Sequence, residues 1–145
     1  DLRRLEGILP AGRFDLVVSN PPYFAMGSGA LAQLPARTAA RADETCTLVE
    51  LCRAAARLLR WGGRFALVFR PERLVDLLTE LHVDGLEPKR LRMVCHQPGH
   101  SPSMVLVEAR RGGKSGLQVD PALFLRREDG GETEEIQKIY FRHRR

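Results

Sequence analysis

Cysteine is scarce in this chain, and its three copies are widely spaced. Cys46, Cys52 and Cys95 are the only thiols among the 145 residues, and no two of them form a Cys-x-x-Cys pair. An odd number at this spacing argues against both a disulfide framework and a structural zinc site. We therefore expect reduced thiols with a packing role, as in a cytoplasmic protein.

Long apolar runs and metal-binding patterns are lacking as well. No stretch of the sequence approaches the roughly 20 apolar residues of a membrane span, and no signal peptide is recognisable. The sequence therefore predicts no membrane partner. The four histidines do not have the spacing of metal ligands, so no metal site is expected. The first residue is Asp1 rather than Met, which suggests an incomplete piece.

What the chain does have is enough apolar residues for one modest core. Its composition is 43% hydrophobic, which is typical of a globular domain rather than a disordered one. The net charge is +5 and the pI is about 9.6. A basic surface suits a nucleic-acid partner, although many other basic proteins bind none.

One stretch organises the rest of the sequence. The apolar run Leu16-Val17-Val18 predicts a strand that is buried on both faces. It ends in Asn20-Pro21-Pro22-Tyr23, where two prolines without N–H groups cannot continue a central strand. Ligands bind at the carboxyl ends of strands in open α/β sheets, so this is the expected position of a site.

These residue types suit the methylation of an exocyclic amine on a planar ring. The side-chain oxygen of Asn20 can accept one amine hydrogen and the Pro21 carbonyl the other, which leaves the nitrogen lone pair free to attack. The Tyr23 ring can stack on the base. A simple turn at the strand end also explains Asn-Pro-Pro, but the strand before it and the aromatic residues after it favour the catalytic interpretation.

A loop rich in Gly, Ala, Ser and Arg is expected over residues 25–42, directly after the motif. Such a loop can close over a substrate, and Arg37 and Arg41 can hold phosphates there. A solvated linker explains the same two arginines equally well.

Alternating helices and strands are predicted for the next part of the chain. A capped helix is expected over Leu48–Arg60, a buried strand over Arg64–Arg70, and a second helix from Pro71 to Gly85. Strands over Arg90–His96 and 104–109 then form an antiparallel pair. The fold class is therefore α/β, with parallel strands that end in an antiparallel hairpin.

The carboxyl-terminal residues carry weaker patterns. Gly112, Gly113 and Gly116 predict a hinge, a short strand is expected over Leu123–Arg127, and a final helix over Glu132–Arg142.

The sequence resembles one family in several separate segments. These segments are Asn20–Phe24, Ala40–Arg41, Cys46–Leu48, Ala66–Pro71, Leu86–Leu91, Val105–Glu108 and the tail Leu123–Tyr140. They are similar to the tRNA1(Val) adenine-N6-methyltransferase-like family, within the Rossmann-like class I methyltransferases. The resemblance implies S-adenosylmethionine as cofactor, tRNA as partner, and the last four strands of a seven-stranded sheet.

The resemblance also implies roles for individual residues. Asn20, Pro21, Pro22 and Tyr23 would form the catalytic loop, with Asn20 also at the cofactor, and Phe24 would help to form the base pocket.

Two departures from the family pattern are visible. Where the family has Ala-Arg-His-Glu, this chain has Ala40-Arg41-Ala42-Asp43. The family's Gly-rich turn and ribose-binding acidic residue have no counterpart, since Gly27-Ser28-Gly29 follows the catalytic loop instead of an opening strand.

Residues 1–145 are thus expected to be the C-terminal catalytic part of one domain. The strand Asp15–Ser19 is then expected to self-associate or to pair with the missing half.

Two alternatives to a tRNA enzyme stay open at this point. A related methyltransferase could act on another planar amine, such as a DNA adenine, the N2 of an rRNA guanine or a protein glutamine. An inactive fragment with only a binding or assembly role is the other alternative.

Overall fold

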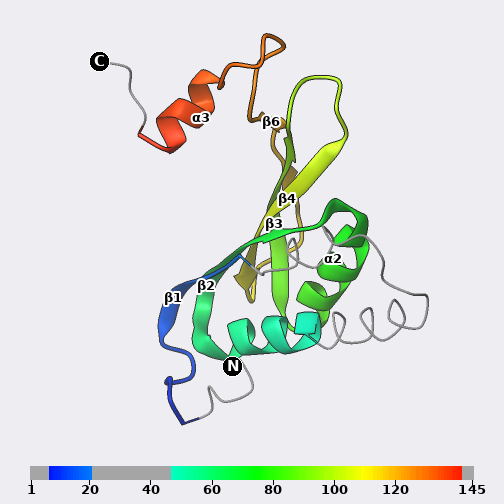
Figure 1. Ribbon diagram of the computed structural model, residues 1–145. Coiled ribbons are helices and arrows are strands. Elements are labelled where there is room, and N and C mark those ends of the chain that lie inside the picture. The colour runs from blue at the N-terminus through cyan, green and yellow to red at the C-terminus, as the bar shows by residue number, and fades with distance from the viewer. Residues whose placement is uncertain (1–6, 21–46, 142–145) are drawn as a thin grey trace, which may run out of the picture.

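The computed structural model describes residues 7–20 and 47–141, and the statements below concern these residues (Figure 1). Their strands form a six-stranded sheet, flanked by a helix over residues 47–58 and by α2. The strands are β1 (Phe14–Ser19), β2 (Leu59–Phe69), β3 (Leu86–Cys95), β4 (Pro102–Arg111), β5 (Gln118–Val119) and β6 (Leu123–Phe124). The other helices are the short 3-10 helix η3 (Pro71–Arg73), α2 (Leu74–Val83) and α3 (Glu134–Ile139).

The order of the strands confirms the predicted fold class. The order is β1-β2-β4-β3-β5, with β6 paired to the far end of β3. β1 is parallel to β2, whereas β4 is antiparallel to both of its neighbours, β2 and β3. The last long strand, β4, is thus inserted between β2 and β3, which are parallel to each other. As predicted, the last two long strands, β3 and β4, form an antiparallel hairpin.

The motif strand lies at the edge of the sheet, not in its middle. β1 has β2 as its one neighbour among the described strands. Leu16 is 46% exposed and Val18 is 68% exposed, whereas Val17 packs against the core. The prediction of a strand buried on both faces is therefore wrong for the described part of the chain. One edge and one face of β1 have no described element against them.

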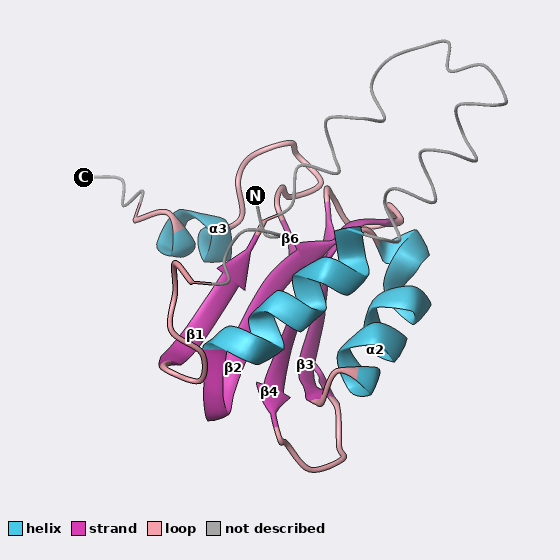
Figure 2. Ribbon diagram, turned by 90° about the horizontal axis from the view of Figure 1, so that it is seen from below, coloured by secondary structure: helices cyan, strands magenta, loops and turns pink. Residues whose placement is uncertain are grey.

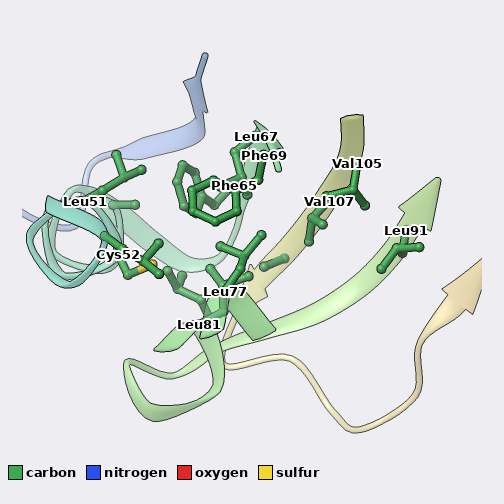
Figure 3. Close-up of a cluster of buried hydrophobic side chains, with 14 of the residues drawn as sticks. Leu51, Cys52, Phe65, Leu67, Phe69, Leu77, Leu81, Leu91, Val105 and Val107 are labelled. Atoms are coloured by element: carbon green, nitrogen blue, oxygen red, sulfur yellow. The ribbon is translucent and has the colours of Figure 1, made fainter. Parts of the chain in front are cut away.

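Both helices that flank the sheet lie on the same face of it (Figure 2). The inward residues of β2, which are Phe65, Leu67 and Phe69, are each at most 3% exposed. They meet Cys52 of helix 47–58 and Leu77 of α2, as the close-up shows (Figure 3). Burial of this apolar surface on one face is the main stabilising contribution that the described residues make.

The boundary between the first helix and β2 differs from the prediction. The helix ends at residue 58 and Leu59 already belongs to β2, so the glycines at 62 and 63 do not stop a helix. They form an irregularity in the strand. Gly62 has a φ of +79°, and a Cβ at Gly63 would lie 2.9 Å from the Arg60 carbonyl oxygen. Glycine is needed there because another residue would clash.

The predicted strand at Arg90 begins earlier, at Leu86, and includes Pro88. The prediction rested on the alternation of apolar and polar residues from Arg90 onward, and a proline inside a strand has no N–H to donate. The structure accommodates it at a register shift between Pro88 and Arg90. The helix that was predicted between Pro71 and Gly85 is confirmed, with Gly85 at a φ of +73° after its end.

The carboxyl-terminal segment runs beside β3 and is fastened to it by two arginines. Arg90 donates to Asp120 at 2.7 and 3.1 Å, and Arg92 holds both oxygens of Glu135 at 2.6 and 2.9 Å. Thr133 caps α3 by accepting from the backbone N–H of Ile136 at 3.3 Å. The predicted short strand and final helix are confirmed, although both are shorter than expected.

We expect the ion pair between Arg92 and Glu135 to stabilise the fold in a pH-dependent manner. The hydrogen bond from Arg92 is the largest cause that lowers the pKa of Glu135. A lowered folded-state pKa gives stability that is present above the unfolded pKa and is lost as the pH falls through the folded one. Glu135→Gln should lower the melting temperature by about 1–4 °C at neutral pH, because this is a half-exposed pair.

The difference between wild type and Glu135→Gln should shrink as the pH is lowered below about 4. Thermal unfolding followed by circular dichroism across this pH range measures it. Glu128→Gln, at an exposed position in the turn before α3, is the control. A difference that stays constant with pH would show that the carboxylate charge makes no contribution.

Candidate active site

Asn20 is the member of the predicted catalytic loop that the structure describes. It follows Ser19 at the carboxyl end of β1, and it is exposed. The other predicted catalytic residues, Pro21, Pro22 and Tyr23, lie outside the described residues. The predicted substrate-binding residues Phe24, Arg37 and Arg41 also lie outside them.

One parallel ladder fixes the position of Asn20. Val17, Val18 and Ser19 pair with Phe65, Ala66 and Leu67 of β2, respectively. Because Phe65 and Leu67 are buried under helix 47–58 and α2, the end of β1 pairs with a closely packed part of the core. The amide of Asn20 therefore starts from a well-defined backbone, although the side chain itself is exposed.

A trough of about 370 Å³ begins at this strand end, on the face of the sheet opposite helix 47–58 and α2. Asn20 and Val18 line it on one side, and Leu106 and Val68 contribute its apolar floor. Arg90 lies on the opposite side. A polar amide at one end of an apolar depression matches the general pattern of a small-molecule site.

Two of the described ionisable groups that line the trough, Asp120 and Arg92, have a shifted pKa. The hydrogen bond from Gln118 is the largest cause that lowers the pKa of Asp120, followed by the bond from Arg90. The hydrogen bond to Glu135 raises the pKa of Arg92. Asp120 is thus held as a carboxylate and Arg92 as a cation near neutral pH, which favours chemistry that needs no strong base at this position.

The described cysteines are structural. Cys52 and Cys95 are free and buried, as the sequence predicted, and Cys46 lies outside the described residues. Burial is the largest cause that raises the pKa of the Cys52 thiol to about 12. A thiol with such a pKa is not a nucleophile at neutral pH.

Two findings concern metals and membranes. Within residues 7–20 and 47–141, no group of three His, Cys, Asp or Glu side chains is arranged to hold a metal ion. None of the helices that the structure describes has both the length and the apolar character needed to cross a membrane.

Sequence analysis missed the part that the carboxyl-terminal segment plays at the site. Asp120 lines the trough, and the arginines that fasten the segment to β3 line it too. A signal was present, because Arg90 and Arg92 alternate with the buried Leu91 and share one face of the strand. Their carboxylate partners are 30 and 43 residues away in sequence, and no local pattern links them.

Comparison with solved structures defines the class of fold. A predicted O-methyltransferase from Agrobacterium tumefaciens superposes over 94% of this chain and 55% of its own length, with a TM-score of 0.70 and 19% identity. A protein from Thermus thermophilus described as a DNA modification methylase superposes over 95% of this chain and 56% of its own length, with a TM-score of 0.58 and 18% identity. The chain therefore has the fold of the carboxyl-terminal part of a class I methyltransferase.

Sequence comparison narrows the relationship to one family. The tRNA1(Val) (adenine(37)-N6)-methyltransferase of Porphyromonas gingivalis is 40% identical over 106 residues, which cover 73% of this chain and 41% of that protein. The protein of the same name from Parabacteroides distasonis is 33% identical over 96 residues, which cover 66% of this chain and 40% of its own length. No family model matches the chain.

The chain is thus a relative of the tRNA1(Val) (adenine(37)-N6)-methyltransferases. It spans about two fifths of the length of these relatives.

Proposed function

We propose that this chain is the carboxyl-terminal catalytic part of an S-adenosylmethionine-dependent enzyme that methylates the N6 of adenine in tRNA. The observation that carries the proposal is the position of Asn20. Its amide stands at the carboxyl end of β1, beside a trough, and Pro-Pro-Tyr follows it in the sequence. The names of the relatives support tRNA as the substrate.

The chemistry asks little more of these residues than hydrogen bonding and stacking. Asn20 accepts one hydrogen of the adenine amine and the Pro21 carbonyl accepts the other, so the nitrogen lone pair points toward the incoming methyl group. Tyr23 and Phe24 hold the plane of the base. S-adenosylmethionine, when bound, supplies an electrophilic methyl group, which the amine nitrogen accepts before it loses a proton to solvent.

Among the described residues, Asn20 is the one suited to touch both the amine and the cofactor. It is polar, exposed and at the strand end where ligands bind in such sheets. Among the described residues of the trough, Asp120 has a lowered pKa and is therefore a weak base, which fits a reaction in which the proton leaves last. Arg37 and Arg41 are proposed to contact phosphates of the tRNA, in the cytoplasm where tRNA resides.

We also propose that the open side of the sheet belongs to an interface within a larger domain. β1 exposes one edge together with Leu16 and Val18, and an apolar edge of this kind is a template for another strand. The partner we propose is a cofactor-binding half, located in the part of the longer relatives that this chain does not cover. Methylation of another planar amine, or a binding role without activity, is the alternative that the experiments below distinguish.

Asn20→Ala in the assembled enzyme should lower the rate of methyl transfer by on the order of 100–1000-fold, because it removes one preorganised polar contact to the amine. A radiolabelled methyl-transfer assay with tRNA, DNA and release factor as acceptors measures this. Gln97→Ala, which removes an exposed amide after β3, is the matched control. An Asn20→Ala variant with more than half of the wild-type activity would contradict the assignment.

Tyr23→Ala should weaken substrate use by about tenfold or more, because base stacking needs the ring. Tyr23→Phe keeps the ring and should stay near the wild-type value. The ratio kcat/KM for tRNA measures both. Equal damage by the two substitutions would assign the function of Tyr23 to its hydroxyl group instead.

The 145-residue chain alone should self-associate through β1 and should not bind S-adenosylmethionine at micromolar concentration. Sedimentation and calorimetry measure the two properties. Val18→Lys places a charge on the exposed side of the edge strand and should make the chain monomeric. A wild-type chain that sediments as a monomer would contradict the proposed interface. Micromolar affinity for the cofactor would show that its site lies within these residues.

A further inference from the structure

A basic surface with an exposed aromatic residue lies at the edge of the sheet opposite Asn20. There β1, β2 and β3 begin and β4 ends. We call this surface the amino-edge patch. Its residues are Arg60, Trp61, Arg64, Lys89, Arg110 and Lys114. Asn20 lies at the other end of β1, so the patch is a separate feature of the molecule.

Trp61 is the single tryptophan of the chain, and 74% of its surface is exposed. It belongs to the irregular start of β2, directly before Gly62 with its positive φ. Its ring rests against Gly112 at the end of β4, where a Cβ would overlap the indole. The absence of a side chain at Gly112 thus lets the ring pack against the backbone, while most of the indole surface stays available to a ligand.

Hydrogen bonds orient the cationic side chains around Trp61, but carboxylates neutralise only some of their charges. Four of these side chains line a cleft of about 400 Å³, namely Arg60, Arg64, Lys89 and Arg110. Arg60 pairs with Asp15, and Arg64 lies 3.9 Å from Glu108. Lys89 instead donates to the backbone carbonyl of Lys114 at 2.7 Å.

Arg110 likewise donates to a backbone carbonyl, that of Gly62, at 3.2 Å. These carbonyl contacts hold the side chains of Lys89 and Arg110 in place without cancelling their charges. The five cations of the patch exceed the three nearby carboxylates, Asp15, Glu87 and Glu108, by two. The patch is therefore a positively charged part of the surface.

We propose that the amino-edge patch is a second RNA-contact surface, on which Trp61 stacks against an unpaired base and Lys89 and Arg110 contact the adjoining phosphates. An inorganic anion would make no use of the indole, and a membrane surface would require more apolar anchors than one. Stacking beside cations is how proteins hold single-stranded nucleic acid. The inference rests on the proposed function, since it assigns a further contact to the same RNA substrate.

The spacing between the patch and Asn20 suits an RNA of tRNA size. Arg64 pairs with Leu16, three residues before Ser19, and Leu59 pairs with Phe14, five residues before it. At about 3.3 Å per residue this register places the patch roughly 10–17 Å along the strand from Ser19, which is about three to five nucleotides of a helical strand at 3.4 Å each. The patch would therefore hold the RNA a few nucleotides away from the methylated base.

The fluorescence of Trp61 tests the proposal directly, because no other tryptophan contributes. The probe is a single-stranded RNA of about 12 nucleotides, titrated into the chain at several salt concentrations. We expect the RNA to quench the emission, whereas tripolyphosphate, which carries charge but no base, leaves it unchanged. Lys89→Ala and Arg110→Ala should each weaken binding and reduce the slope of log affinity against log salt by about 1.

Lys138→Ala, on the exposed side of α3, is the matched charge control and should leave RNA affinity unchanged. Filter binding of Trp61→Ala and Trp61→Phe separates stacking from folding damage, since Ala should lose about tenfold in affinity and Phe much less. Saturable RNA binding without a change in emission would overturn the proposal. So would an absence of RNA binding, or equal losses in Lys89→Ala and Lys138→Ala.

The RNA contact and the proposed enzymatic function can be tested independently. If Trp61→Ala leaves methyl transfer to tRNA unaffected, the proposed RNA contact at the patch is contradicted and the proposed enzymatic function still stands. If RNA quenches the emission of Trp61 but the protein methylates no RNA, the RNA contact is supported and the proposed enzymatic function is contradicted.

Discussion

The parallel ladder between β1 and β2 is the interaction on which the account of this protein depends. Asn20 has a defined position because Val17, Val18 and Ser19 pair with three successive residues of β2. The inward side of β2 is in turn fixed by close packing, since Phe65, Leu67 and Phe69 are almost completely buried. An amide that must meet a substrate amine within hydrogen-bonding distance needs such a support behind it.

The same ladder leaves the other edge of β1 without a described partner, and helix 47–58 and α2 both lie on one face of the sheet (Figure 2). This asymmetry explains why a strand with the composition of a central one has exposed Leu16 and Val18. It also explains why the trough beside Asn20 is open along the sheet. The larger core cluster lies on one face, and α3 covers the other face only near Val94. Both the proposed cofactor half and the proposed RNA contacts would lie on surfaces that these residues leave accessible.

Local patterns in the sequence were sufficient for most of the fold. Apolar runs and turn residues gave β1, α2 and the final hairpin, because each of these is determined by residues close together in the chain. The start of β2 was misjudged, since Gly62 and Gly63 mark a strand irregularity that looks like a helix stop in sequence alone. Within the candidate site, Asn20 was found through its motif, whereas Asp120 depends on a contact with Arg90 that spans 30 residues.

Mass spectrometry of nucleosides tests the central claim most directly. In this measurement tRNA is incubated with the assembled enzyme and S-adenosylmethionine, digested, and compared with a parallel reaction of the Asn20→Ala variant. We expect N6-methyladenosine as the new nucleoside, formed by the wild type and nearly lost in the variant. A methyl group on guanine N2, or one that appears in DNA or on protein glutamine and not in tRNA, would contradict it.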